Sequence, residues 1–591
     1  MIFLAIHIGH NATVALSING KIISVISEER ITRIKNFTGF PVEAIKSVVK
    51  KFLNDDISKI DKFVFIDGTG LALRYIKNQD YVAQKFSSYA WEGKDKFLIK
   101  NKLYGVLGNK NANFIAKIYR NFKSKNLKIN KNKILNKILE LNPEIKFDLK
   151  KVVFFDHHEM HALSHGYFKN TDKNDHIIFT MDGEGDNQSS TVNIFQNGEI
   201  KNISKNSNDH SIGYFFAETT KLLGLKAFEH EFKVMGMAPY SRIKDVNRIL
   251  KSLENLIFLK NDGSFHSKIV SSLFKYEIDK IFKYEKFENI CGAAQIFTEK
   301  LILNWIEYWV KKTSINNVVL SGGVFMNIKA CKEVSKLDIV NEMLVVPSCS
   351  DESLPFGALY KINRLNNQNI SIVKNLYLGM SYSENIDDFI KNLDKKKFII
   401  KKYKDFKDLN NDAAKLIAEN NIIARCAGRE EWGARALGNR SILCNPSKLE
   451  NIKIINEAIK QRDYWMPFSP SILKDDANKY FLNPKNVDAR FMTCLFESTD
   501  LAKNHLKAAI HPIDYTMRPQ LIDEEINREY HDLISKFKKI SGIGGLLNTS
   551  FNLHGEPNVS NYDSAIHTLI NSKLNYLIIE NYLIEKNLKT K

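Results

Sequence analysis

The residues most suggestive of chemistry are the histidines of the segment Asp156–Ala162, which reads Asp-His-His-Glu-Met-His-Ala. This segment follows an apolar run typical of a strand, Val152–Phe155, and its own pattern predicts the start of a helix. On a helix, His157 and His161 project from the same face, so that two imidazoles can hold one metal ion. His158 points roughly 100° away and is the poorer ligand. The alternative is a capped helix start whose polar side chains bind only backbone groups.

Carboxylates that follow two later strands are candidates to complete a metal site. The apolar run Met343–Val346 leads to Asp351, and a carboxylate at a strand end often serves as a ligand in α/β folds. Two imidazoles and this carboxylate would leave open positions on ferrous iron, manganese or zinc. Asp182 follows another strand, His176–Met181, on a glycine-rich turn where an acid can approach a metal or a nucleotide. A simple Asp-Gly hairpin is the alternative there.

Small-residue turns between elements predict a phosphate or nucleotide site. The N-terminal strand Met1–Ile8 leads into the turn Gly9–Ala12, whose backbone N–H groups can face a phosphate. The strand Val318–Leu320 leads into Gly322 and Gly323, and a helix follows. Backbone N–H groups at a helix N-terminus favour anions, so this turn predicts a phosphate or ribose cradle.

Two charged segments allow both a functional and a solvated interpretation. Residues 27–35 read Ser-Glu-Glu-Arg-Ile-Thr-Arg-Ile-Lys and predict a charged turn that either faces a substrate or faces water. Residues 230–238 predict a second polar loop, in which Lys233 either neutralises a phosphate or extends from the surface.

The length and composition indicate a multi-domain globular protein. A chain of 591 residues is too long for one core and predicts two or three domains. No apolar run reaches the roughly 18 residues of a membrane span, and the N-terminal run lacks a basic leader, so we expect a cytoplasmic protein without a membrane partner. The six cysteines contain no Cys-x-x-Cys pair, which predicts reduced, mainly buried thiols.

The net charge of +19 has two possible causes. Nucleic-acid binding is one, but lysine is abundant along the whole chain, so a solvated surface is the favoured interpretation and no nucleic-acid partner is expected. Residues 71–149 are lysine-rich and predict a helical insertion with helices at Asn111–Phe122 and Asn132–Leu141. This insertion could shape an acceptor pocket or the contact of a homodimer.

The region after the strand Ile422–Arg425 predicts an anion site. Three arginines, Arg429, Arg435 and Arg440, lie within twelve residues and are separated by glycines. Clustered guanidiniums are costly unless anions neutralise them, and their forked donors suit a phosphate. Other residues with polar side chains in this half of the chain are further candidates for the anion site: Ser441, Lys460, Arg462, Arg518, Asn548 and Ser550. Small hydroxyl and amide groups can bind an oxyanion or a urea-like group.

The order of these motifs resembles the O-carbamoyltransferases of the nodulation and antibiotic-tailoring type. The motifs are Gly-His-Asn-Ala, Ser-Glu-Glu-Arg with a following Thr-x-Arg, His-His-x-x-His-Ala, Asp-Gly-x-Gly, Lys-Val-Met-Gly-x-Ala, Ser-Gly-Gly-Val-x-x-Asn and Asp-Glu-Ser, followed by the arginine-rich region. Two departures are Ala434, where the family often has proline, and Pro512, where it has a histidine that His511 displaces by one position.

The resemblance implies an α/β fold with two domains. Residues 1–370 would form a carbamoyl-transfer domain like the universal tRNA threonylcarbamoyladenosine protein, with two related lobes of the actin and heat-shock-chaperone type. Residues 371–591 would form a smaller α/β domain with a twisted mixed sheet, like the threonylcarbamoyl-adenylate synthase.

The resemblance also implies two half-reactions. The second domain would make carbamoyl adenylate from carbamoyl phosphate and ATP with Mg²⁺, and the first would pass the carbamoyl group to a hydroxyl of a sugar or other small molecule. Ferrous iron is the preferred ion, with manganese and zinc as alternatives. The implied metal ligands are His157, His161 and Asp351, and the implied catalytic residues are His10, His158 and Lys233. The implied cofactor-binding residues are Asp182, Gly322, Gly323, Asn327, Arg429, Arg435, Arg440, Ser441, Lys460, Arg462, Arg518, Asn548 and Ser550.

Two other functions stay open. A sugar or acetate kinase on the same nucleotide-binding fold would explain the N-terminal half but would leave the arginine-rich motifs without a role. A partner in tRNA threonylcarbamoyl modification would draw support from the basic charge. The acceptor pocket carries no recognisable signature for a particular sugar or secondary metabolite.

Overall fold

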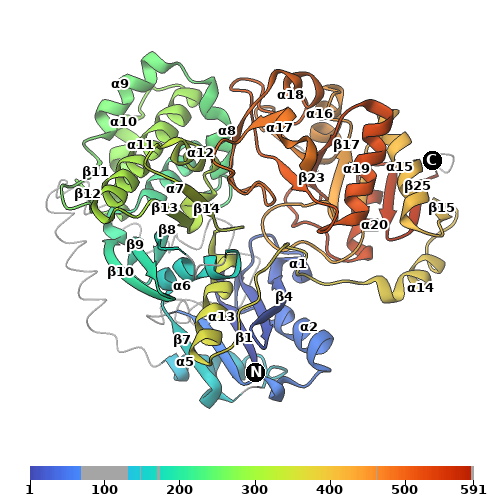
Figure 1. Cartoon of the computed structure of the whole chain (residues 1–591), viewed down its shortest axis with the longest axis horizontal. Helices are drawn as coiled ribbons and strands as arrows, with labels where there is room; N and C mark the ends of the chain where they lie inside the picture. The colour runs from blue at the N-terminus through green and yellow to red at the C-terminus, as the bar shows by residue number, and fades with distance from the viewer. Residues whose placement is uncertain (68–130, 147, 170–173, 461, 588–591) are drawn as a thin grey trace. The chain divides into compact units, whose positions relative to one another are not determined.

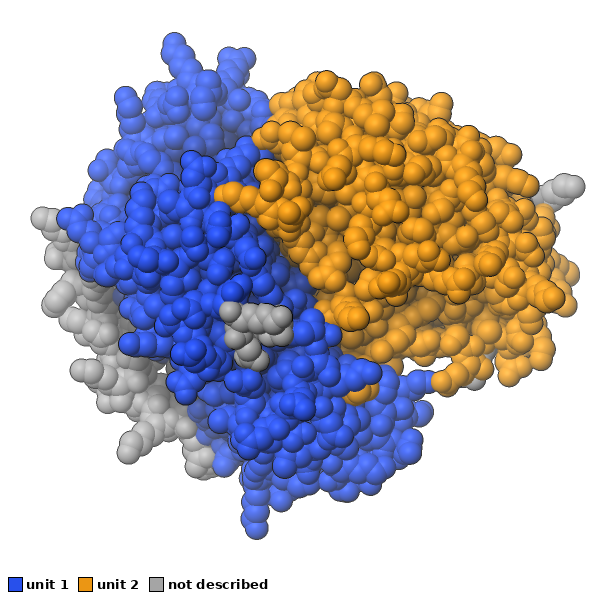
Figure 2. Space-filling model, viewed as in Figure 1, with its two compact units in different colours: residues 1–22, 36–372 blue, residues 23–35, 373–591 orange. Residues whose placement is uncertain are grey.

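The computed structural model describes residues 1–67, 131–146, 148–169, 174–460 and 462–587. The chain divides into two compact units (Figure 2): residues 1–22 with 36–372, and residues 23–35 with 373–591. The second unit therefore includes a short segment from near the N-terminus. The predicted helix Asn111–Phe122 and most of the predicted insertion 71–149 lie outside the described residues. The function assigned to each domain stays a prediction.

A five-stranded sheet is built from residues of the first unit, except that residues 23–27 of its edge strand are counted with the second unit. Its order is β4 (Lys21–Ser27), β3 (Thr13–Ile18), β1 (Ile2–His7), β6 (Lys62–Ile66) and β7 (Val152–Phe155). Strand β1 pairs antiparallel with β3 and parallel with β6, which pairs parallel with β7. The central strands are nearly continuous apolar runs because helices and turns cover both faces.

A second five-stranded sheet of the same unit repeats this plan. Its order is β10 (Glu199–Ser207), β9 (Gln188–Gln196), β8 (His176–Gly185), β13 (Asn317–Ser321) and β14 (Glu342–Val345). Strand β8 pairs antiparallel with β9 and parallel with β13, which pairs parallel with β14. Both sheets thus place their strands in the chain order third, second, first, fourth, fifth. This repetition confirms the predicted α/β fold of two related lobes.

Two helices pack between these sheets (Figure 1). The first, α6 (His157–Leu163), contacts β8 and β9, and the second, α13 (Leu354–Leu365), contacts β1, β3 and β6. The helices also contact each other, and a Cβ atom built on Gly357 would lie 1.9 Å from the carbonyl oxygen of Met160. The close approach of α6 and α13 therefore requires glycine at this position.

Further helices in the described part of the first unit pack against the two sheets or against one another (Figure 1). They are α2 (Val42–Leu53), α5 (Lys131–Glu140), α7 (Ile212–Leu222), α8 (Glu231–Met237), α9 (Ile243–Leu253), α10 (Phe274–Ile281), α11 (Phe287–Thr313) and α12 (Ile328–Lys336). Helix α5 confirms the helix predicted at Asn132–Leu141. Helix α8 replaces the loop predicted around Lys233, and the residues Val234, Met235, Gly236 and Met237 that follow this lysine are buried.

The second unit is built on an eight-stranded mixed sheet. Its order is β15 (Phe398–Lys402), β25 (Tyr582–Lys586), β24 (Tyr576–Ile579), β16 (Ile423–Cys426), β17 (Arg440–Cys444), β23 (Gly545–Ser550), β18 (Ser469–Leu473) and β22 (Gln520–Ile522). The pairs β16–β24 and β18–β22 are parallel, and the other pairs are antiparallel. Helices α15 (Phe406–Ala418) and α19 (Arg528–Ser541) contact each other. The mixed sheet confirms the predicted architecture of this part.

Residues 27–35 differ from the predicted charged turn. Residues 28–32 form a short helix, α1 (Glu28–Thr32), in which Glu28 and Arg30 are buried. Arg30 donates to the carbonyl oxygen of Gly433, and Arg33 donates to the carbonyl oxygens of Pro557 and Asn558. These charges therefore hold the segment within the second unit.

Other features match the composition. All six cysteines lie in the described parts and are buried thiols, as predicted. Among the helices described, none combines the length and apolar content that a membrane-spanning segment requires.

The glycine between α6 and α13 gives a test of the packing. Replacing Gly357 by alanine places a methyl group against the carbonyl of Met160, and we expect the free energy of unfolding of the first unit to fall by about 1–3 kcal/mol. Urea unfolding followed by circular dichroism measures this change. Leu365→Ala is the control because Leu365 ends the same helix with 64% of its surface exposed, and a change within about 0.5 kcal/mol is expected. Equal stability of Gly357→Ala and the unaltered chain would contradict the proposed contact.

Candidate functional site

Helix α6 presents two imidazoles to a buried cluster. Asp156 caps this helix, since its side chain accepts a hydrogen bond from the N–H of Glu159 at 2.9 Å. The N–H of His157 donates to Asp186 at 2.8 Å. His157 and His161 then project from one face, as their spacing predicted, and His161 is fully buried. The helix cap and the shared face of the two imidazoles are therefore both present in this segment.

The fit of the His157 ring depends on a glycine in β8. A Cβ atom built on Gly185 would lie 2.1 Å from Cδ2 of His157. The second glycine of the Asp-Gly-x-Gly motif therefore leaves room for the imidazole, and strand β8 runs through Asp182 where a turn was predicted.

Two carboxylates face the imidazoles. Asp182, in β8, places Oδ2 3.1 Å from Nε2 of His161, and Asp351 places Oδ1 3.5 Å from the same nitrogen. The Nε2 atom of His157 lies 3.6 Å from Asp351 Oδ1 and 3.8 Å from Asp182 Oδ2. Asp351 begins a short helical turn, residues 351–353, directly before α13. Three separate segments of the first unit thus converge on one point.

The four side chains fit a divalent metal ion. One ligand atom from each of His157, His161, Asp182 and Asp351 lies within 4.8 Å of every other. The Nε2 atom of His157 is buried and makes no hydrogen bond within the described part of the chain. Imidazole and carboxylate ligands suit ferrous iron, manganese and zinc alike. Asp182 was predicted as a cofactor contact, and its place in this set could have been inferred from the acid that follows a buried strand.

The electrostatics of the cluster favour a bound cation. Burial raises the pKa of Asp351 well above its usual range, and the neighbouring charge of Asp182 raises it further. Despite its own burial, Asp182 keeps a pKa well below its usual range because the neighbouring imidazoles of His157 and His161 stabilise its anion, His161 through a hydrogen bond. Burial lowers the pKa of His157, but the charges of Asp351 and Asp182 outweigh it and raise the pKa above its usual value. A cation would relieve the repulsion between the two carboxylates.

A further histidine borders the cluster and was not predicted. His7, at the end of β1, lies with Nε2 3.6 Å from Asp351 Oδ2 and 3.0 Å from the carbonyl oxygen of His10. Burial and the charge of His157 lower the pKa of His7 to about 3, so the ring is neutral. The available signal was a lone polar residue within an otherwise apolar strand.

The predicted catalytic residues occupy different surroundings. His158 is buried with Nδ1 2.9 Å from Thr180 Oγ1 and Nε2 3.1 Å from the carbonyl oxygen of Gln188. Both ring nitrogens are therefore engaged in the core, and burial lowers its pKa to about 3, which argues against a role as general base. His10 lies in the short strand β2 (Gly9–His10), next to the cluster through its contact with His7. Lys233 lies in the first turn of α8 and is partly exposed.

The Gly322–Gly323 turn touches the cluster directly. The N–H of Gly323 donates to Asp182 Oδ2 at 3.2 Å, and Gly322 has φ 99° with a Cβ position only 2.3 Å from the carbonyl oxygen of Met181. Asn327 caps α12 by accepting from the N–H of Ala330, and its amide exchanges two hydrogen bonds with Gln295. The turn thus orients Asp182, whereas the side chain of Asn327 forms hydrogen bonds with the backbone of α12 and with Gln295.

The second unit brings four cations together. Burial and the charges of Arg435 and Arg462 lower the pKa of Arg518 well below its usual range, and burial and Arg435 lower that of Arg462 to about 10. Burial and the charges of Arg462 and Lys35 lower the pKa of Lys460 well below its usual range. Because like charges oppose one another there, this group, which we call the cation cluster (Arg435, Lys460, Arg462 and Arg518), is suited to an anion.

Polar side chains border the cation cluster. Arg518 donates through Nε and Nη2 to Ser469 Oγ at 3.2 and 2.9 Å. Lys460 donates to Ser550 Oγ at 3.1 Å, and the amide of Asn548 donates to the carbonyl oxygen of Ala436, next to Arg435. The Oδ1 atom of Asn548 is buried and accepts no hydrogen bond from the described residues.

Arg429, Arg440 and Ser441, which were also predicted to bind an anion, form hydrogen bonds mainly with backbone groups. Arg440 is fully buried and donates to the carbonyl oxygens of Ala427, Gly428, Asn439 and Ser560. Arg429 donates to the carbonyl oxygens of Ile23, Leu378 and Gly379, and Ser441 Oγ accepts from the N–H of Gly438. Backbone carbonyls therefore engage most donors of these guanidiniums and support the loop that carries Arg435, although Nη2 of Arg440 is buried without a hydrogen-bond partner among the described residues.

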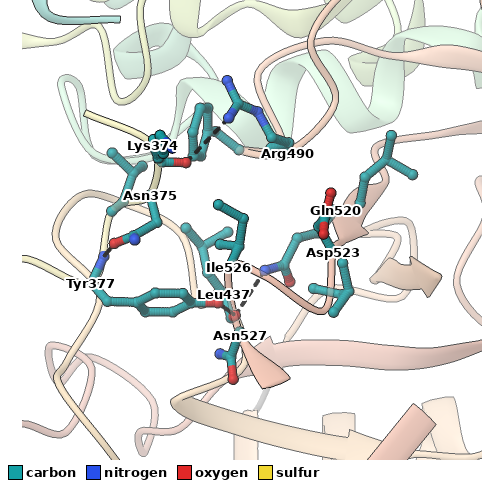
Figure 3. Close-up of a pocket in the computed structure, with 13 residues that line it drawn as sticks. Lys374, Asn375, Tyr377, Leu437, Arg490, Gln520, Asp523, Ile526 and Asn527 are labelled. Carbon is teal, nitrogen blue, oxygen red and sulfur yellow. Dashed lines mark hydrogen bonds between the residues drawn. The ribbon is translucent and has the colours of Figure 1, made fainter. Parts of the chain in front are cut away.

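A small cavity is lined in part by Leu437 of the same loop (Figure 3). Its lining includes Tyr377, Gln520 and Leu437, and the Tyr377 hydroxyl and Gln520 amide both donate to the carbonyl oxygen of Leu437, at 2.8 and 2.7 Å. Arg490, at its rim, is engaged by Asp488 and by the carbonyl oxygen of Lys374. None of the predicted site residues lines this cavity, and its contacts support the position of Leu437.

The sequence is similar to known proteins over its whole length. An uncharacterized protein of Methanocaldococcus jannaschii is 29% identical over 592 residues, which cover 98% of each chain. Nodulation protein NolNO of Sinorhizobium fredii is 26% identical over 597 residues, which cover 98% of this chain and 79% of that protein. Full-length HypF, solved in its phosphate- and nucleotide-bound form, is 12% identical and matches 62% of this chain and 47% of its own with a TM-score of 0.35.

Family profiles agree with the resemblance seen in the motifs. Residues 3–359 match the profile described as Carbamoyltransferase N-terminus, and residues 414–586 match Carbamoyltransferase C-terminus. Because the first match alone extends over more than half of the 591 residues, this chain belongs to the carbamoyltransferase family and is a transferase enzyme.

Proposed function

We propose that the chain is an ATP-dependent O-carbamoyltransferase that works through carbamoyl adenylate. In this proposal the second unit activates the carbamoyl group and the first unit transfers it to a hydroxyl of a sugar or secondary metabolite. The observation that carries the proposal is the cation cluster, in which Arg518 and Arg462 repel each other and Arg435 in the absence of an anion. A kinase on the same nucleotide-binding fold would have no use for it.

The first half-reaction requires charge neutralisation more than covalent help from the protein. Water would release phosphate from carbamoyl phosphate, and an oxygen of the resulting carbamate would displace pyrophosphate from the α-phosphorus of ATP. Arg435, Arg462 and Arg518 would bind the phosphate oxygens with forked, charge-assisted hydrogen bonds. The Mg²⁺ that accompanies ATP would share this charge. The amides and hydroxyls of Asn548 and Ser550 suit the neutral carbamoyl group.

The second half-reaction is acyl transfer. The acceptor hydroxyl would attack the carbamoyl carbon, the bond to the phosphate oxygen of AMP would break, and the hydroxyl proton would leave to a base. His10 is the proposed base, because it adjoins the cluster and His158 has both nitrogens engaged. A divalent ion held by His157, His161, Asp182 and Asp351 would neutralise charge on the leaving phosphate. The N–H of Gly323 would keep Asp182 oriented toward that site.

Removing one guanidinium from the cation cluster tests the first half-reaction. We expect Arg518→Ala and Arg462→Ala each to lower pyrophosphate release from ATP and carbamoyl phosphate by about 10- to 100-fold, because each loses a charge-assisted hydrogen bond to a phosphate oxygen. Phosphate and pyrophosphate release are measured in the same reaction.

Arg528→Ala is the matched control, because Arg528 belongs to the same unit and its side chain is 66% exposed. Wild-type rates of pyrophosphate release in the two cluster variants would rule out the assigned role. Formation of ADP without carbamoyl phosphate would support the kinase instead.

Removing one imidazole tests the division between the two sites. We expect His161→Ala to keep pyrophosphate release within about twofold of wild type while carbamoyl transfer falls by about 100-fold or more. The reason is that the proposed metal ligands of the first unit act only after the carbamoyl group has been activated. Transfer is followed by mass spectrometry of a metabolite extract, as the gain of one carbamoyl group. His266→Gln, on β12 (Phe265–Ser267) of the same unit, is the control. If His161→Ala abolishes pyrophosphate release as well, the two-site division is wrong.

A further inference from the structure

A buried carboxylate beside Asp351 has no role in the reaction described above. Glu352 is only 5% exposed. Its Oε2 accepts a hydrogen bond from Nδ2 of Asn11 at 3.2 Å, and its Oε1 accepts one from Oγ of Ser348 at 2.6 Å. A buried carboxylate is costly without such partners, so these two bonds account for its presence.

Both donors lie in strained backbone. Asn11 has φ 57° and Ser348 has φ 48°, in the left-handed region that residues other than glycine rarely adopt. Asparagine tolerates this conformation better than serine does. Since such residues persist where surrounding contacts determine them, Glu352 is placed to hold two strained turns at once.

The two turns carry residues of the first unit's cluster. Asn11 follows His10 directly, and its carbonyl oxygen accepts from Thr13 Oγ1 at 2.8 Å. Ser348 comes three residues before Asp351, and the N–H of Gly322 donates to the carbonyl oxygen of Cys349 at 2.8 Å. A second link runs in parallel, because His7 contacts both the carbonyl oxygen of His10 and Asp351.

We propose that Glu352 is a positioning residue that locks the Gly9–Ala12 turn to the Ser348–Asp351 turn. The lock fixes Asp351 relative to His10, so that the distance between the proposed metal ligand and the proposed base stays constant. It requires a hydrogen-bond donor at position 11 and an acceptor at position 352. The role of Asp351 as a ligand rests on the proposed function, whereas the lock itself is a property of the folded first unit.

A pair of compensating substitutions tests the lock in the full chain. Asn11→Asp removes the donor and leaves two carboxylates facing each other, so that the bond is lost. Adding Glu352→Gln returns a donor, because the introduced amide can bond to the new carboxylate. We expect amide deuterium exchange in residues 8–12 and 347–353 to become about tenfold faster in Asn11→Asp and to return to within about twofold of wild type in the double variant.

Two further variants separate this effect from a general loss of folding. Ser348→Ala removes one of the two bonds and should speed exchange only in residues 347–353. Glu277→Gln is the matched control, since Glu277 is a buried carboxylate of α10 with lysine partners and should leave both segments unchanged. Exchange in β16 of the second unit reports any general unfolding. Unchanged exchange in Asn11→Asp, or no recovery in the double variant, would overturn the lock.

A metal-binding measurement links the lock to the site. Mn²⁺ alone is titrated into the full chain and followed by electron paramagnetic resonance. Residues that orient metal ligands typically contribute 10- to 100-fold in affinity, so we expect Asn11→Asp to weaken Mn²⁺ binding by about tenfold or more and the double variant to recover it. If the wild-type chain binds no Mn²⁺, the metal role in the proposed function fails, and the exchange result alone decides on the lock. If Mn²⁺ binds equally to all variants, Glu352 does not position Asp351.

Discussion

The repulsion between two half-buried carboxylates is the constraint on which the first unit depends. Asp182 and Asp351 reach the same small volume from β8 and from the turn before α13, and burial alone would disfavour either charge. The fold accepts this cost by placing the imidazoles of α6 between them. That placement in turn requires the bare backbone of Gly185 beside His157 and of Gly357 at the helix crossing. The packing of α6 against α13 and the placement of the four charged side chains therefore depend on each other.

The second unit also brings like charges together, but there they are the positive charges of arginines. Arginines are used there in two ways, and their partners tell the uses apart. Arg440 donates through Nε and Nη1 to backbone carbonyls that hold the loop between β16 and β17, and its Nη2 atom has no hydrogen-bond partner among the described residues. Arg518 donates through Nε and Nη2 to the hydroxyl of Ser469, and burial together with other cations lowers its pKa. Forked donors of this kind would suit the phosphate of the proposed reaction.

The sequence allowed some of these features to be predicted and concealed others. The strand predicted at Val152–Phe155 agrees with the structure, because turn residues on both sides of an apolar run mark where the strand begins and ends. The imidazole pair matched because helical spacing alone puts His157 and His161 on one face. The buried role of Arg440 could not be predicted, since residue type does not reveal which carbonyls surround a side chain. The position of His7 beside the cluster was not predicted, because His7 is the only polar residue of the strand Ile2–His7 and no second polar residue marked that strand end as part of a site.

The proposed order of the two half-reactions follows from the charges of the two units. A cluster with two carboxylates repels a phosphate, whereas the cation cluster attracts one. An adenylate would therefore form readily in the second unit, and it would be held in the first only when a cation balances Asp182 and Asp351. In this proposal transfer would depend on the ion held by the four ligands of the first unit, whereas activation would need only the Mg²⁺ that accompanies ATP. The ion of the first unit would then act through its charge, a role that iron, manganese and zinc can each fill with these ligands.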